Sequence, residues 1–263
     1  MKKNKKKWVI RTIWSIIILL WILFLSRLEY KIMTNTEVVK NKDFKVIAII
    51  PEASGICLVE SSNTFFVVSD EWKISEISNK WKILREKKIW KYDFEWIVCD
   101  EKNKKLYLLI EETWNLLSIF IDDLKVDKLI TLDISNKERE KYFDSKSWAE
   151  WVAIIWDTIF ISTQKKDKNL LEFSFSKSRQ KLKLEKIYDI KSHDLSGMTF
   201  YNKSLYILSD EKNEIYVYDI NKEKIKETIQ LEKWDWEGII FDKKWQLYLA
   251  DDSWRVVEYD IVK

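Results

Sequence analysis

A pattern of eight residues recurs five times along the chain, and this internal repeat restricts the possible folds more than any other feature. Each copy holds a serine or glutamate, then a glycine or tryptophan that we call the pivot, and then an aliphatic residue or methionine. Consecutive pivots are 41, 55, 46 and 41 residues apart. The five copies are EASGICLV (52–59), DFEWIVCD (93–100), WAEWVAII (148–155), DLSGMTFY (194–201) and DWEGIIFD (235–242).

A further short apolar segment begins eight to ten residues after each pivot, and a third and a fourth follow in several repeats. Four short strands per repeat, at a period of about 40 to 45 residues, are typical of β-propeller blades. The last repeat ends after its third strand, and FKVIAII (44–50) can supply the missing one. We therefore predict an all-β, five-bladed β-propeller over residues 44–263, with six blades as the alternative. Pairing of the two chain ends would close the ring and remove its open sheet edges.

The N-terminal segment has the character of a membrane anchor. Residues 1–7 hold five lysines, and residues 8–30 are apolar, without a charge from Thr12 to Ser26. No small-residue cleavage site follows the apolar run, so we expect an uncleaved transmembrane helix rather than a signal peptide. The lysines place the N-terminus in the cytoplasm and the propeller outside it. Residues 31–43 are predicted to be a linker in this single-pass protein of the cell membrane.

The basic residues gather at the N-terminus. Residues 1–40 carry nine Lys and Arg against two acidic residues, although the whole chain has a net charge of only +3. The rest of the chain is therefore net negative, and nucleic acid is excluded as an expected partner.

The counts of tryptophan and glycine are abnormal, at fifteen and three. The pivots are Gly55, Trp96, Trp151, Gly197 and Gly238, yet a position that needs glycine for close approach cannot also hold an indole. Tryptophan also stands at expected turn positions. These include Trp72, Trp81, Trp114, Trp245 and Trp254. We interpret most of these residues as glycines encoded by UGA, in an alternative genetic code, and read as tryptophan. Trp236 is the expected exception, because Phe94 and Leu195 stand at the equivalent position of other repeats and this position favours an apolar side chain.

Acidic residues are predicted to collect at one end of the ring, because each pivot begins a first strand and each acidic pair ends the antiparallel second strand. Such carboxylates suit Ca²⁺, whereas the alternative is that they cap turns and stay solvated. The candidate ligand-binding residues beside the pivots are Ser54, Glu95, Glu150, Ser196 and Glu237. The candidate metal ligands are Asp70, Glu71, Glu111, Glu112, Asp210, Glu211, Asp251 and Asp252.

The sequence excludes several other kinds of site. A single histidine, His193, rules out a centre built from several imidazoles. Ser196 belongs to the repeat column, so a Ser-His-Asp hydrolase site is not expected, and we name no catalytic residue. Cys57 and Cys99 lie two and three residues after their pivots. Because this offset predicts opposite facing, we expect buried thiols rather than a disulfide.

The repeated motifs resemble those of the SdiA-regulated family. The resemblance rests on FEGIV and AEGVA, with glycine restored at Trp96 and Trp151, on WEGII, and on LYILSDEKNEIYVYDI (205–220). It covers about residues 44–263 and implies a membrane-attached, extracytoplasmic β-propeller. It also implies a link to calcium response in some members and a distant similarity to phytase-like and esterase-like propellers. The third repeat departs from the acidic pattern at Gln164 and Lys165, which weakens a calcium site around the whole ring.

Three functions remain open from the sequence. The first is an anchored binding or scaffold module that presents its acidic end to a cation, a small ligand or an envelope protein. The second is a Ca²⁺-dependent hydrolase of phosphate or carboxylic esters. The third is a structural part with no ligand. We favour the first, because no catalytic constellation is visible in the sequence.

Overall fold

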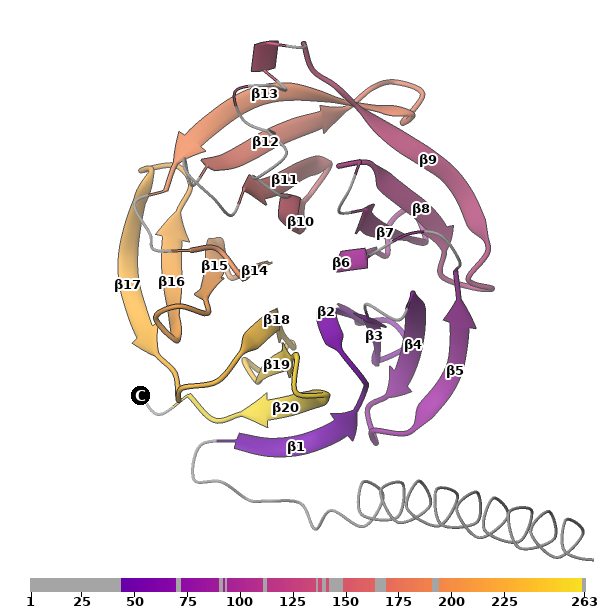
Figure 1. Cartoon of the computed structure of the whole chain (residues 1–263), viewed down its shortest axis with the longest axis vertical. Helices are drawn as coiled ribbons and strands as arrows, with labels where there is room; N and C mark the ends of the chain where they lie inside the picture. Colours follow the sequence, from indigo (N-terminus) through magenta and orange to yellow (C-terminus); the bar gives the residue numbers. More distant parts are fainter. Residues whose placement is uncertain are drawn as a thin grey trace, which may run out of the picture. The chain divides into compact units, whose positions relative to one another are not determined.

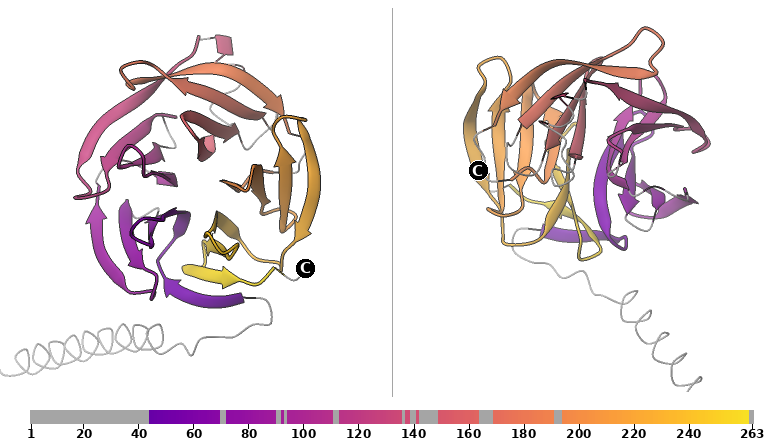
Figure 2. Two further views of the ribbon diagram at one scale, coloured as in Figure 1. Left: turned by 180° about the vertical axis from the view of Figure 1, so that it is seen from behind. Right: turned by 45° about the horizontal axis from the view of Figure 1, so that its top comes forward.

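A computed structural model describes residues 44–69, 72–89, 92, 94–110, 113–135, 137–138, 141, 149–163, 169–190 and 194–261. These residues form twenty strands, arranged as five four-stranded antiparallel units around a common centre (Figure 1). The all-β, propeller-like architecture predicted from the repeats is thus confirmed. Figure 2 shows the same ring from behind, with the first strand of each unit innermost.

The strands follow the order of the repeats. The first unit consists of β2 (Ala53–Val59), β3 (Thr64–Ser69), β4 (Lys73–Ser78) and β5 (Ile83–Lys88). The second consists of β6 (Phe94–Asp100), β7 (Lys105–Ile110), β8 (Leu116–Phe120) and β9 (Val126–Asp133). The third consists of β10 (Ala149–Ile155), β11 (Thr158–Thr163), β12 (Asn169–Phe175) and β13 (Lys181–Asp189). The fourth consists of β14 (Gly197–Tyr201), β15 (Ser204–Ser209), β16 (Glu214–Asp219) and β17 (Lys224–Gln230).

The fifth unit joins the two ends of the described chain. It contains β18 (Trp236–Phe241), β19 (Leu247–Asp251) and β20 (Arg255–Tyr259), and its outer strand is β1 (Phe44–Ile49). β1 pairs antiparallel with β20, with Phe44 opposite Tyr259 (Figure 1). The prediction that the segment 44–50 supplies the missing fourth strand is therefore confirmed.

The second and third units are joined at their outer edges. β9 pairs in parallel with β13 from Thr131–Lys181 to Asp133–Lys183, so the two units form one eight-stranded sheet. The sequence analysis did not predict this contact. Because both strands are the outermost of their units, the pairing covers two edges that would otherwise present unpaired main-chain groups.

Burial varies from the centre of the ring to its rim. β3 and β15 are buried at every position, since their sheets have neighbours on both faces. A strand covered on both faces is a continuous apolar run, and TFFVVS and SLYILS fit that description. The outer strands β5 and β17 are mostly exposed and rich in charged residues. These charges protect the rim from pairing with other chains.

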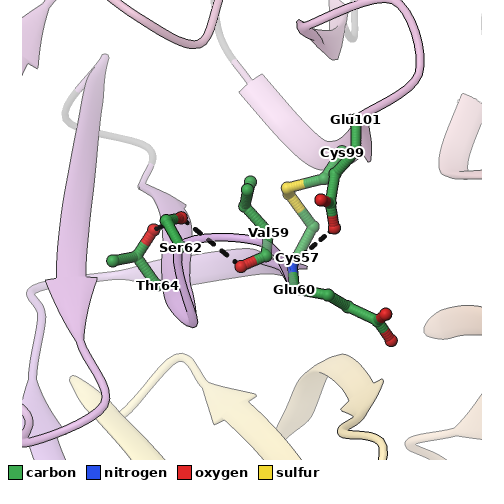
Figure 3. The surroundings of a disulfide bond; sticks show 7 residues. All are labelled: Cys57, Val59, Glu60, Ser62, Thr64, Cys99 and Glu101. Carbon is green, nitrogen blue, oxygen red and sulfur yellow. Dashed lines mark hydrogen bonds between the residues drawn. A yellow bond between two sulfur atoms is a disulfide. The ribbon is translucent and has the colours of Figure 1, made fainter.

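The expectation of free thiols was wrong, because Cys57 and Cys99 form a disulfide with Cα atoms 5.7 Å apart (Figure 3). The sheets stack face to face, and a Cβ built at Gly55 would lie 3.0 Å from the Cα of Trp96. Gly55 and, two residues later, Cys57 therefore face the second unit. Cys99, three residues after its pivot, faces the opposite way, back to the first unit. The odd offset brings the two cysteines together, because neighbouring units meet through opposite faces.

Within the described residues, no helix combines the length and the apolar character that a membrane span needs. The predicted anchor at residues 8–30 lies outside the described part of the chain.

Candidate functional site

In four of the five units the residue before the pivot lies in a β-bulge. In the first unit Ala53 is opposite Ser69 and Gly55 is opposite Val68, so Ser54 between them has no partner on β3. The same irregularity occurs in the second, third and fifth units. There the register shifts at Glu95, Glu150 and Glu237. A bulge redirects the side chain of the extra residue. The residues directly before the pivots, which we call the pre-pivot column, therefore stand apart in these four units from the regular pairing of their sheets.

The two serines of this column are buried and hold neighbouring units together. The Ser54 hydroxyl donates a hydrogen bond to the carbonyl of Phe94 at 3.0 Å, across to the next unit. The Ser196 hydroxyl donates the equivalent bond to the carbonyl of Trp236 at 3.1 Å. Ser54 is 2% exposed and Ser196 is 5% exposed. These hydroxyls therefore serve the packing of the ring and are not presented to solvent.

The glutamates of the column are placed differently. Glu95 and Glu237 are half-buried, and both take part in interactions with other groups. The side chain of Glu150 lies outside what the structure describes, as do Asp70, Glu71, Glu111 and Glu112. The predicted collection of acidic groups at one end of the ring therefore remains a prediction in the first three units.

A group of carboxylates gathers where the fourth and fifth units meet. Asp194 is buried and accepts hydrogen bonds from the Ser209 hydroxyl and from the main-chain N–H groups of Asp210 (2.8 Å) and Glu211 (3.2 Å). Asp210 is half-buried, and Asp252 is exposed. We call Glu52, Asp194, Asp210, Asp235 and Asp252 the acidic cluster.

Members of the acidic cluster repel one another. Burial raises the pKa of Asp210 to about 6, and the negative charges of Asp194, Asp235 and Asp252 add to the rise. Burial also raises the pKa of Asp252, with added contributions from Asp235 and Glu52. Because each charge disfavours ionisation of the next, the cluster favours any cation that can approach it.

Asp251 does not join the acidic cluster. Its side chain is fully buried and forms an ion pair with Arg255, with the Arg255 Nε 2.9 Å from the Asp251 Oδ2. The guanidinium of Arg255 lies 3.8 Å from the centre of the Trp234 ring. Burial raises the pKa of Asp251 to about 6 in spite of this cation. Asp251 thus belongs to a buried ion pair inside the fifth unit, and Glu211 is the remaining predicted ligand, exposed beside Asp210.

Three members of the acidic cluster, Glu52, Asp194 and Asp235, were not among the predicted site residues. A signal for them was present, because an acidic residue stands three positions before the pivot in four of the five repeats. These residues are Glu52, Asp93, Asp194 and Asp235.

The described side chains do not form a preformed metal centre. Among them, no three His, Cys, Asp or Glu groups are arranged to hold a metal ion. Ca²⁺ takes six to eight oxygen ligands, so the acidic cluster supplies charge and some oxygens but no complete coordination shell.

The centre of the ring holds a small cavity that is lined mostly by aliphatic side chains. A cavity of about 130 Å³ is bounded by the first strands of all five units, with Ile56, Val152 and Ile239 among its lining residues. The disulfide of Cys57 and Cys99 also borders it. The side chains that line this cavity are mostly aliphatic, whereas the carboxylates described above lie in the acidic cluster.

Four-stranded antiparallel units around such a centre define a β-propeller-like protein. The sequence model of the SdiA-regulated family matches residues 31–253, and the chain belongs to this family. No curated protein matches it. Among solved structures, the glutaminyl cyclase of Myxococcus xanthus is similar, with a TM-score of 0.62 and 10% sequence identity over 82% of this chain and 95% of that one. At this identity the likeness concerns the fold alone.

Proposed function

We propose that this protein is a membrane-anchored, extracytoplasmic binding module whose acidic cluster takes up Ca²⁺ and, with it, an envelope protein or a small ligand. The single observation that carries the proposal is the grouping of Asp210 with Asp194, Asp235 and Asp252, where burial and mutual repulsion raise the pKa of Asp210 to about 6. A divalent cation relieves that repulsion directly. Since the described ligand shell is incomplete, we expect weak affinity, on the order of 10⁻⁴ to 10⁻³ M, as in extracellular calcium modules.

The disulfide supports a location outside the cytoplasm. Disulfides persist in oxidising compartments and are rare where glutathione keeps thiols reduced. Cys57 and Cys99 are paired and join two units of the propeller, so the fold uses an oxidised pair as part of its structure. This agrees with the orientation predicted from the five N-terminal lysines.

A binding function is favoured over the calcium-dependent hydrolase. A phosphate site normally brings Arg or Lys side chains onto the ligand. At this end of the fifth unit, Arg255 is engaged with the buried Asp251 and stacks over Trp234. The acidic cluster therefore offers carboxylates to a metal ion. Among these neighbours it has no basic side chain that is available to bind a phosphate.

The test is a calorimetric titration of the purified full-length chain with Ca²⁺ at pH 7.5. We expect saturable binding, weakened at least tenfold in the Asp210→Asn, Asp252→Asn double variant. The matched control is Asp122→Asn with Asp123→Asn, which removes two acidic groups from the β8–β9 turn at the opposite end of the ring and is expected to bind as the parent does. Absence of binding at millimolar Ca²⁺, or equal binding by both double variants, would contradict the proposal.

A further inference from the structure

Six of the ten described tryptophans have a left-handed backbone. Their φ angles lie between 58° and 74°, whereas none of the three glycines has a positive φ. L-residues with bulky side chains rarely adopt this conformation, because the Cβ atom clashes with the backbone, and glycine adopts it freely. The six residues are Trp72, Trp81, Trp114, Trp156, Trp245 and Trp254.

All six stand in turns between successive strands, and the equivalent turns of other units show what the geometry needs. The N–H groups of Trp72 and Trp254 donate to the carbonyls of Ser69 and Asp251, three residues earlier. In the fourth unit Asn213 makes the same bond, to Asp210, with φ of 55°. Asparagine is one of the few non-glycine residues that tolerate this conformation. The turn is therefore a conserved element of the repeat within this chain and requires a left-handed residue.

The indoles at three of these turns are partly or largely exposed. Trp156 is 83% exposed, Trp72 is 38% exposed and Trp254 is 36% exposed. An exposed indole does not offset the strain of its own backbone, since the hydrophobic gain depends on the apolar area removed from water. Trp156, the most exposed of the three, therefore gains little from burial.

The pivot column shows the same conflict inside the ring. A Cβ added to Gly238 would lie 2.8 Å from the Cβ of Ala250, so that pivot has no room even for a methyl group. At the equivalent positions Trp96 and Trp151 are 2% and 1% exposed, with ring centres 4.8 Å apart. The Nε1 atom of Trp151 is buried without a hydrogen-bond partner. A buried unpaired N–H costs about 1 to 3 kcal/mol.

We propose that the native protein carries glycine at these eight positions, because its gene specifies glycine with a codon that is elsewhere read as tryptophan. Trp236 is the internal contrast. Its Nε1 atom donates a hydrogen bond of 2.9 Å to the Glu232 carbonyl, and its ring packs against Phe44 and Tyr259. Trp236 therefore has the packing of a genuine tryptophan. This inference is independent of the proposed cation binding.

The direct test is peptide mass spectrometry of the protein isolated from its native cells. We expect the residue mass of glycine at the six turn positions and at positions 96 and 151, and that of tryptophan at position 236. The residue mass of tryptophan at the turn positions would overturn the proposal.

A recombinant series separates the backbone effect from loss of the indole. Trp72, Trp156 and Trp254 are changed together to glycine in one variant and to alanine in another. Both variants remove the indoles, but only glycine relieves the left-handed strain. We expect the glycine variant to melt at a higher temperature than both the alanine variant and the parent chain. If the glycine variant melts at or below the temperature of the alanine variant, these turns do not require glycine.

Discussion

The carboxylate of Asp194 accepts a hydrogen bond from the main-chain N–H of Asp210 at 2.8 Å, so two acidic residues are fixed next to each other at the end of β15. Asp194 is held by three donors and is buried, whereas Asp210 keeps a partly exposed side chain. The buried residue shapes the turn, and its charge contributes to the raised pKa of its neighbour.

The pH dependence of stability follows from Asp210. Its pKa is about 6 in the folded protein and 3.8 in the unfolded chain, so the folded state binds more protons between these values. The stability from this group is complete below about pH 4 and is lost as the pH rises through about 6. We expect Asp210→Asn to be more stable than the parent at pH 7.5 and equal to it near pH 4, by urea unfolding at both pH values. The pKa of Asp251 is also raised, so the stability of the Asp210→Asn variant still falls to some extent as the pH rises. Equal stabilities at pH 7.5 would show that Asp210 is not destabilised by its neighbours.

The disulfide should account for a large share of the stability of the ring. It closes a loop of 42 residues between the first and second units. We expect the Cys57→Ser, Cys99→Ser double variant to lose roughly 3 kcal/mol of unfolding free energy. A reducing agent should lower the melting temperature of the parent and leave that of the double variant unchanged. The same melting temperature for the parent with and without reductant would refute the pairing.

The serine contacts between units are expected to stabilise the ring by a measurable amount. Ser196→Ala removes the buried hydrogen bond from the Ser196 hydroxyl to the Trp236 carbonyl. The expected loss is about 1 to 2 kcal/mol in chemical unfolding. Ser61→Ala is the control, because Ser61 is exposed. Similar small effects of both variants would mean that the bond between units contributes nothing measurable.

Arg179 links the second and third units at the end of the ring opposite to the acidic cluster. Its guanidinium lies 3.3 Å from the carboxylate of Asp100 and donates to the Tyr107 hydroxyl at 3.1 Å. Since the Asp100 side chain is only 5% exposed, Arg179→Ala leaves a buried carboxylate without its cation, at a cost of about 2 kcal/mol. Lys102→Ala breaks the exposed pair with Asp157 and should cost less than about 1 kcal/mol. Thermal unfolding of the two variants compares a buried with an exposed ion pair. Equal losses of stability would contradict the larger contribution assigned to the buried pair.

The fold was largely accessible from the sequence, because repetition reveals architecture without knowledge of any contact. The five pivots located the units, and the truncated last repeat indicated that Phe44 onward completes the ring. The parallel pairing of β9 with β13 was not accessible, since nothing in the composition of either strand distinguishes it from other outer strands.

The candidate site was predicted less well. In four of the five units the residue before the pivot is a bulge position, and Ser54 and Ser196 use this place in the repeat for packing between units. A residue type that recurs at one position of every repeat indicates a role in the repeated structure. That role can be packing between units as well as binding. The disulfide was missed for a related reason: alternation along a strand gives the direction of a side chain within its sheet, but not which faces of two sheets meet.

Carbon-detected NMR titration of the Asp210 carboxyl group, with and without Ca²⁺, tests the account of the acidic cluster most directly. The account predicts a pKa of about 6 without Ca²⁺, in line with burial and the charges of Asp194, Asp235 and Asp252, and a clear fall when Ca²⁺ is added. A pKa near 4 that does not respond to Ca²⁺ would contradict both the mutual repulsion and the proposed cation binding.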